Sequence, residues 1–239
     1  MNVMQNSVKS WVLAVLAVGL IGLAVQPILA RKGKGKTEFS EVMARMNDTA
    51  KKLKTVSANL AYTTFTVLVN DKSTETGQLF YERKGKNTDI RININKPDTK
   101  VMLLRKNKAE IFLPKINQVQ EYDLAQKSDL VQQFLLLGFG SEINDLKKSY
   151  DIKNFREEDL DGDTAAVLEL TPRKESTAAQ LTKIELWISE DSWLPVQQKF
   201  YERGGDYLIA RYTGMKVNLN LPGGTFDLHD SGAKHVKMN

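Results

Sequence analysis

The sequence predicts a mainly β protein of the α+β class, built from one curled antiparallel sheet and about three helices. Apolar and polar residues alternate over most of the chain after residue 57, which is the period of half-buried strands. Turn sequences such as Asp161-Gly162 and Gly204-Gly205 separate these segments by short distances. A sheet of about ten or eleven strands linked in this way rarely stays flat, so we expect it to curl around interior space.

The first part of the chain has the features of an export signal. Lys9 precedes fifteen apolar or glycine residues at 11–25, and Ala30 stands before a basic run. Fifteen residues are fewer than the roughly 20 that a membrane-spanning helix needs, which favours cleavage after Ala30 over retention as an anchor. Either outcome carries the rest of the chain across a membrane. The predicted divisions are a signal peptide (1–30), a basic flexible linker (31–37) and one domain (38–239).

The elements of that domain follow from changes of period. Apolar residues at spacings of three and four predict a helix over 37–56. A second helix is expected at 128–137, between Ser128 as its cap and Gly138 as its terminator, and a third at 141–148. The apolar side of helix 128–137 suits either a cover over the interior or an ordinary packed helix. Strands are expected at 60–69, 75–84, 88–95, 99–105, 108–113, 117–123, 150–157, 164–171, 181–189, 194–203 and 206–217, with a short extended piece around Phe226.

The composition argues for binding rather than catalysis. The chain has no cysteine and only two histidines, His229 and His235, so thiol chemistry, disulfides and cysteine-ligated zinc are excluded. We predict no enzyme activity, no metal site and no cofactor, and Asp159, Asp161 and Asp163 fit a hairpin tip better than a calcium loop. Without residues 1–30 the net charge is +4, which is too small to argue for nucleic acid as a partner.

Several short motifs occur in a familiar order. They are LKTVSANL at 53–60, GQLFYER at 77–83, IFLPKINQV at 111–119, LTP at 170–172 and GTFDL at 224–228. In this order the chain resembles the periplasmic outer-membrane lipoprotein carrier family, LolA, and the wider LolA-like superfamily, over about residues 38–236. Lys84 stands where the family usually has proline, and the tail after Phe226 also departs from the pattern.

The resemblance implies a fold, a function and partners. The fold would be an incomplete antiparallel β-barrel of about ten or eleven strands, closed by about three helices over an apolar cavity. The protein would be a monomeric periplasmic carrier that takes acylated lipoproteins or lipids from an inner-membrane release complex to an outer-membrane acceptor. The alternative is an envelope sensor or structural module of the same fold that binds such a ligand without moving it.

The resemblance also implies a role for one arginine. Arg83 matches the family's strand arginine, which pairs with the lid helices in the empty form, and it shares a strand face with Leu79 and Tyr81. The alternative is an ordinary arginine at a hairpin end in water. Alternation and the resemblance together predict the following lipid-facing residues: Leu79, Tyr81, Ile90, Ile92, Ile94, Phe134, Leu135, Ile184, Leu186, Val196 and Phe200.

Overall fold

The computed structural model describes residues 37–85, 87–124, 137, 139–140 and 142–238, and these residues belong to one compact unit. The expected signal peptide, most of the linker and residues 128–136 of the second expected helix lie outside the described residues. Among the described residues, no helix has both the length and the apolar composition needed to cross a membrane.

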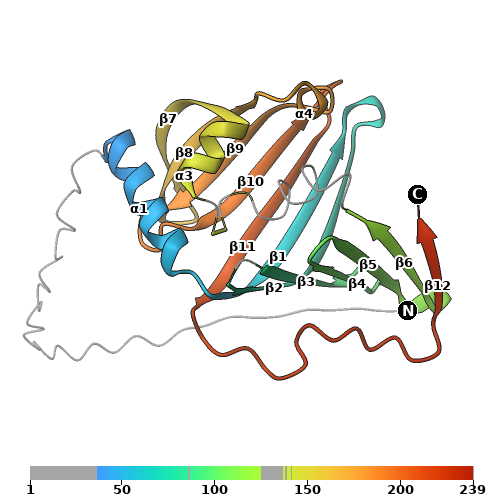
Figure 1. Cartoon of the computed structure of the whole chain (residues 1–239). Helices are drawn as coiled ribbons and strands as arrows, with labels where there is room; N and C mark the ends of the chain where they lie inside the picture. The colour runs from blue at the N-terminus through green and yellow to red at the C-terminus, as the bar shows by residue number, and fades with distance from the viewer. Residues whose placement is uncertain (1–36, 86, 125–136, 138, 141, 239) are drawn as a thin grey trace, which may run out of the picture. The chain divides into compact units, whose positions relative to one another are not determined.

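Strands dominate the described chain, and helices are few (Figure 1). The helices are α1 (Phe39–Lys52), α3 (Ile143–Ser149) and α4 (Glu175–Ala178), with short 3-10 helices η1 (Val67–Val69) and η2 (Pro114–Ile116). The strands are β1 (Thr55–Thr66), β2 (Asp71–Lys84), β3 (Asn87–Lys96), β4 (Lys100–Arg105), β5 (Lys108–Leu113), β6 (Gln118–Asp123), β7 (Tyr150–Leu160), β8 (Asp163–Pro172), β9 (Leu181–Ser189), β10 (Pro195–Glu202), β11 (Tyr207–Val217) and β12 (Lys234–Met238).

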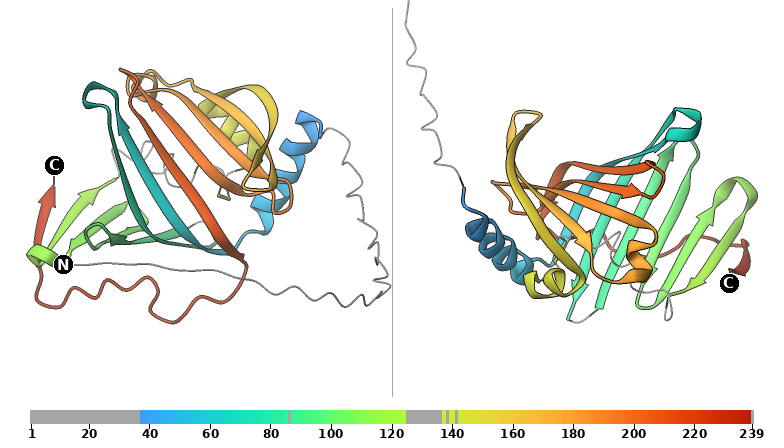
Figure 2. Two further views of the ribbon diagram at one scale, coloured as in Figure 1. Left: turned by 180° about the vertical axis from the view of Figure 1, so that it is seen from behind. Right: turned by 90° about the horizontal axis from the view of Figure 1, so that it is seen from above.

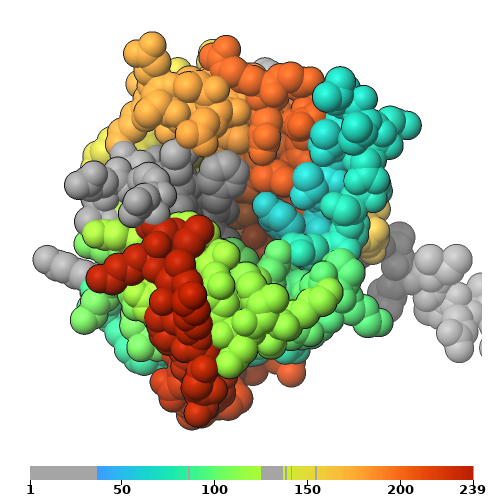
Figure 3. All heavy atoms as spheres, turned by 90° about the vertical axis from the view of Figure 1, so that its right-hand side faces the viewer, coloured from blue at the N-terminus to red at the C-terminus, as the bar shows by residue number. Residues whose placement is uncertain are grey.

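All twelve strands form one open sheet in the order β12-β6-β5-β4-β3-β2-β1-β11-β10-β9-β8-β7. Neighbours pair antiparallel except β12, which returns from the C-terminal segment to pair parallel with β6. The two views in Figure 2 show the sheet strongly curved, and Figure 3 shows the C-terminal segment against the strands beside it. The expected mainly β architecture with an incomplete, unclosed sheet is confirmed, although the strand count is higher than predicted.

One face of the sheet carries the helices, and we call it the inner face. On α1, Val42, Met43, Met46 and Ala50 recur at the spacing of one helical stripe and are buried. The first three belong to the cluster that includes Leu168 and other alternate residues of β8, β9 and β10. Alternation therefore divides β8, β9 and β10 into an inner apolar side and an outer side.

Three local expectations were wrong, and two short elements were not predicted. The first helix ends at Lys52 rather than at residue 56, because Val56 pairs with Tyr81 and Val217 as part of β1. The end of the expected strand 60–69 forms the 3-10 helix η1 instead. Phe226 is buried in a turn and not in a strand. Neither α4 nor β12 was expected, since both are too short to show a period.

Candidate functional site

The inner face of β2 and β3 is mostly apolar. Leu79 pairs with Ile92 and Tyr81 pairs with Ile90, so their side chains point to the same side. These four residues and Ile94 are each no more than 5% exposed. The structure thus brings together the five residues of this hairpin that sequence alternation selected, and their lipid-binding role remains a prediction.

The same face continues across β8, β9 and β10. Ile184 pairs with Phe200 and Leu186 pairs with Gln198, and all four side chains are buried. Ile184, Leu186 and Phe200 share a cluster with the apolar stripe of α1 and with Ile143 and Leu146 of α3. The two helices α1 and α3 therefore cover the apolar face of these strands.

Val196 is placed differently from the prediction. It packs against the cluster of Ala165, Val167 and Trp187 on the outer face, opposite to Phe200. The register shifts between Pro195 and Gln197, and this bulge reverses the direction in which residue 196 points. Phe134 and Leu135, also predicted to face lipid, lie outside the described residues.

Arg83 binds the end of α1. Its Nη2 donates to the backbone oxygens of Ala50 at 2.7 Å and Lys51 at 3.1 Å, in the last turn of the helix. These carbonyls have no partner within the helix, and the helix dipole makes that end negative, so a guanidinium is well matched to it. The side chain is half-buried rather than solvated at a hairpin end. The contact joins the helix directly to the sheet.

The chain at Gly140 comes close to the same arginine. Gly140 has φ of +68°, and a Cβ atom there would lie 2.5 Å from the hydroxyl of Tyr81 and 3.6 Å from Nη1 of Arg83. Only glycine fits, both for its backbone angle and for the space. Burial raises the pKa of Tyr81 above its ordinary value, although the nearby charge of Arg83 opposes this, so the hydroxyl stays neutral.

A buried polar pair, missed at the sequence level, holds the chain at Leu137. Gln198 is fully buried, and its Nε2 donates to the carbonyl oxygen of Leu137 at 2.6 Å. The hydroxyl of Tyr212 donates to Oε1 of Gln198 at 3.0 Å, and its ring meets Phe139 edge-on at 5.0 Å. The only available signal was that Gln198 has the same strand parity as Phe200. A polar residue at an inward position needs a partner, and the carbonyl of Leu137 is that partner.

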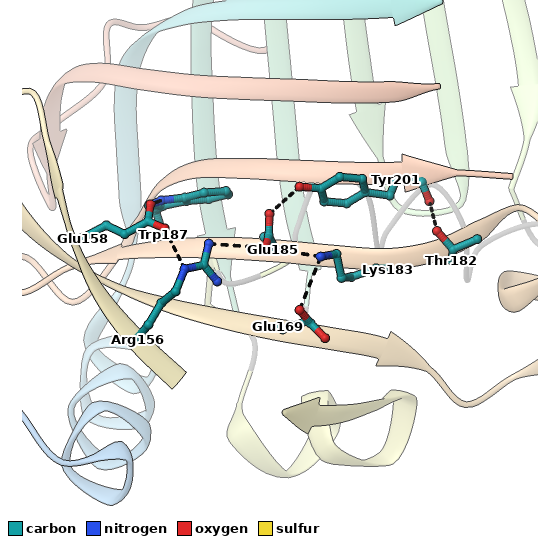
Figure 4. A network of polar contacts seen from close by, with 8 residues as sticks. All are labelled: Arg156, Glu158, Glu169, Thr182, Lys183, Glu185, Trp187 and Tyr201. Carbon is teal, nitrogen blue, oxygen red and sulfur yellow. Dashed lines mark hydrogen bonds and ion pairs between the residues drawn. The ribbon is translucent and has the colours of Figure 1, made fainter. Parts of the chain in front are cut away.

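The outer face of β7 to β10 carries a network of charged groups (Figure 4). The carboxylate of Glu185 accepts from Tyr201 at 2.6 Å and lies 3.3 Å from Arg156 and 3.4 Å from Lys183. Burial acts to raise the pKa of Glu185, but the Tyr201 hydrogen bond and the two cations together hold it below its ordinary value. The network satisfies the polar groups of this face without forming a reaction centre.

Two cavities bounded by described residues are lined mainly by polar groups. One, of about 420 Å³, lies between the ends of β2 to β4 and the chain at residues 221–227. The other, of about 500 Å³, is bounded by β1, β2, β11 and the end of β3. Neither has the apolar lining that an acyl chain requires, so the inner face is the better candidate site.

One set of side chains in the described chain could supply ligand atoms to a metal ion. Glu110, Glu121 and His235 have candidate ligand atoms within 4.8 Å of one another. Lys108 already lies 2.9 Å from Glu110 and 3.1 Å from Glu121, which offsets their charge. Hydrogen bonding to Glu121 raises the pKa of His235, and Asp230 contacts the other ring nitrogen at 2.8 Å. We interpret this set as the attachment of β12 to β6.

The described fold is an open, curved, mainly antiparallel sheet with helices on its apolar face. A protein from Thermus thermophilus, described as an uncharacterized conserved protein, has this fold: it is 12% identical, with a TM-score of 0.53 over 83% of this chain and 98% of that one. MucB is 14% identical, with a TM-score of 0.51 over 81% of this chain and 64% of that one. The comparisons also include a LolA superfamily protein from Nitrosomonas europaea, 17% identical, with a TM-score of 0.39 over 80% and 98% of the two chains.

Residues 92–218, more than half of the chain, match a family model described as "Uncharacterized protein", and the chain belongs to that family. No curated protein matches the sequence. The chain spans 60% and 64% of the length of two MucB chains that it matches, one of them in the Pseudomonas aeruginosa MucA/MucB complex. At these identities the likeness defines the fold alone.

Proposed function

We propose that the protein is a periplasmic carrier that binds the acyl chains of lipoproteins or lipids on its inner face and moves them from the inner to the outer membrane. The single observation that carries the proposal is the apolar inner face, formed by two buried clusters, with Arg83 holding the end of α1 beside it. Export by a cleaved signal peptide at residues 1–30 and a monomeric state are parts of the same proposal.

The energetics require such a site to open and close. Burying one acyl methylene contributes about 0.8 kcal/mol, so a chain of about 16 carbons could contribute roughly 12 kcal/mol. Full burial of two chains would exceed the range of reversible binding, near 18–21 kcal/mol. The side chains of α1 now occupy part of the face, so acyl chains would have to displace them. The competing contact lowers the net affinity and makes release feasible.

Arg83 supports the closed arrangement in this proposal. Its two hydrogen bonds to α1 are lost when the helix leaves the sheet, so they favour the form without cargo. Replacement by leucine would remove them and favour the open form. We expect Arg83→Leu to retain more lipid and to transfer it less well to acceptor vesicles.

The experiment compares Arg83→Leu with Arg91→Leu. Arg91 is also a half-buried arginine that donates to a backbone oxygen, that of Asp227 at 2.7 Å, but the chain it holds is the C-terminal segment and not α1. Native mass spectrometry of exported protein would measure the retained lipid, and a vesicle assay would measure transfer. Equal retention and transfer in the two variants and the wild type would reject the role of Arg83. Absence of any acyl ligand in all of them would reject the carrier.

A sensor of the same fold is the second candidate. MucB, whose fold is matched, is also described in complex with MucA, so this fold accommodates binding to another protein. In that case lipid would bind to the inner face without moving to an acceptor membrane, and a stable protein complex would be isolated instead. The transfer assay therefore separates the two candidates.

A further inference from the structure

The turn between β1 and β2 exposes three consecutive aliphatic residues. The side chains of η1 are 46% exposed at Val67, 92% at Leu68 and 67% at Val69. In the described part of the chain, the other large apolar residues with comparable exposure are Ile116 and Leu219, each alone. The hairpin that carries η1 ends at the upper right of Figure 1, where its turn is drawn in cyan, and its atoms lie at the surface in Figure 3. An apolar group at a protruding tip costs solubility without contributing to the core.

The backbone of this turn is firmly held. Asn70 adopts a left-handed conformation, with φ of +47°, and its N–H donates to the carbonyl of Val67 at 3.1 Å. The N–H of Val67 donates to the carboxylate of Asp206, in the neighbouring β10–β11 turn, at 2.8 Å. The fold therefore presents the three side chains in a defined arrangement.

The molecule contains a second turn of the same design with a lysine at its centre. Between β5 and β6, the 3-10 helix η2 ends at Asn117, whose φ is +48° and whose N–H donates to the carbonyl of Pro114. Its central residue is Lys115, which is 80% exposed and lies 3.5 Å from Asp98. The corresponding position of the first turn is Leu68. The backbone geometry thus does not require leucine at position 68, because the equivalent position of η2 is a solvent-exposed lysine.

Aromatic rings and a lysine follow directly behind the tip. Phe65 stacks on Tyr207 with ring centroids 4.9 Å apart, and Tyr201 is the next ring, 6.4 Å from Tyr207. The ammonium of Lys199 lies 4.2 Å from the ring of Tyr207 and 4.5 Å from that of Tyr201. Proteins at a membrane interface arrange their side chains in this order: aliphatic groups lie outermost, amphipathic rings come next, and a lysine that can reach water follows.

We propose that this turn inserts Val67, Leu68 and Val69 into the surface of a lipid bilayer. A convex tip of three aliphatic side chains needs no matching pocket in fluid hydrocarbon, whereas a protein partner would have to supply one. The rings behind the tip would then lie at the headgroup level. The inference concerns the outer end of a hairpin and does not depend on what the inner face binds.

The absence of cysteine makes a local test direct. Leu68→Cys and Lys115→Cys each introduce one thiol for a polarity-sensitive fluorophore, at equivalent positions of the two turns. Each labelled protein, as exported from the cell, is mixed with vesicles of phosphatidylethanolamine containing a minority of phosphatidylglycerol. We expect a blue shift and increased emission at position 68 and an aqueous spectrum at position 115. Aqueous spectra at both positions, or equal shifts at both, would overturn the proposal.

Affinity gives a second, independent measurement. Leu68→Lys introduces the lysine that stands at the centre of the other turn, and the side chain at 68 is 92% exposed, so the variant should fold. Vesicle binding should weaken about tenfold because one leucine is no longer transferred from water. Lys115→Leu is the reverse control, and it should not raise binding to the same extent. Unchanged binding of Leu68→Lys would count against insertion, as would capture of a protein by the wild-type tip without vesicle binding. Lipid retention on the inner face is measured separately, so failure here leaves the carrier proposal intact.

Discussion

The two faces of β8, β9 and β10 satisfy their buried polar groups in different ways. On the inner face, Gln198 makes two neutral hydrogen bonds, to Leu137 and with Tyr212. On the outer face, Glu185 is almost as buried, but it shares its charge with Arg156 and Lys183 (Figure 4). A neutral amide suits an apolar surface, where an uncompensated charge would be costly. The inner face can therefore exclude water, whereas the charged groups of the outer face are compatible with solvent.

This difference also favours the inner face over the outer face as the proposed lipid site. Apolar groups with few polar interruptions can exchange contacts with α1 for contacts with hydrocarbon at little cost in hydrogen bonds. The outer network loses ion pairs if any group moves, and gains nothing from an acyl chain. Substitutions on the two faces of the same strands can test this contrast.

The largest expected effect is on packing. Leu186→Ala on the inner face of β9 should lower the free energy of unfolding by about 2–5 kcal/mol, because a fully buried leucine leaves a cavity. Lys183→Ala, on the outer face of the same strand, should cost about 1 kcal/mol or less, because its ion pairs are partly screened by solvent. Urea denaturation of both variants measures the contrast. Equal losses would mean that the two faces do not differ in packing.

A smaller effect is expected at the buried amide. Gln198→Leu keeps the side-chain volume similar but removes the donor to Leu137 and the acceptor of Tyr212, at a cost of about 1–3 kcal/mol. Tyr212→Phe removes only the second bond. If the pair acts as one unit, Tyr212→Phe should cost less in the Gln198→Leu background than in the wild type. Additive losses in this double-mutant cycle would show that the hydrogen bond between Tyr212 and Gln198 contributes no stability.

Much of this contrast could be predicted from sequence. The alternation of Ile90, Ile92 and Ile94 identified the inner side of β3, because the period of a strand is two residues and burial follows it. The placement of Val196 was wrong because a bulge adds one residue and reverses the parity. The neighbouring Pro195 is compatible with either a strand start or a bulge, so it does not fix the register by itself. The parity rule thus works within a strand and fails across an irregularity.

The contacts between distant segments could not be predicted. Gln198 and Leu137 are 61 residues apart, and no period relates them. The contact of Arg83 with α1 was implied by the family resemblance, and alternation alone supplied only its strand face. β12 joins β6 across more than 100 residues with a strand of five residues, too short to show alternation. Local pattern defines faces, whereas tertiary partners depend on topology.

The smallest expected effect is the loss of stability when the charge of Glu185 is removed. This loss should depend on pH on the outer face only. The pKa of Glu185 lies below its ordinary value of 4.5 in the folded protein, since its hydrogen bond and cation partners outweigh burial. A lowered folded pKa contributes stability that is complete above the ordinary pKa and is lost as the pH falls through the folded pKa. Glu185→Gln should therefore cost about 1 kcal/mol or less near neutral pH, and its deficit should shrink below about pH 4.5.

The inner amide provides the matched control for this pH dependence. Gln198 does not titrate, and burial raises the pKa of Tyr212, so both groups stay neutral from acid to neutral pH. The deficit of Gln198→Leu should be the same at both ends of that range, while the deficit of Glu185→Gln should not. Urea denaturation at several pH values measures both. A constant deficit for Glu185→Gln would show that its charge contributes nothing, and the contrast between the faces would then be one of packing alone.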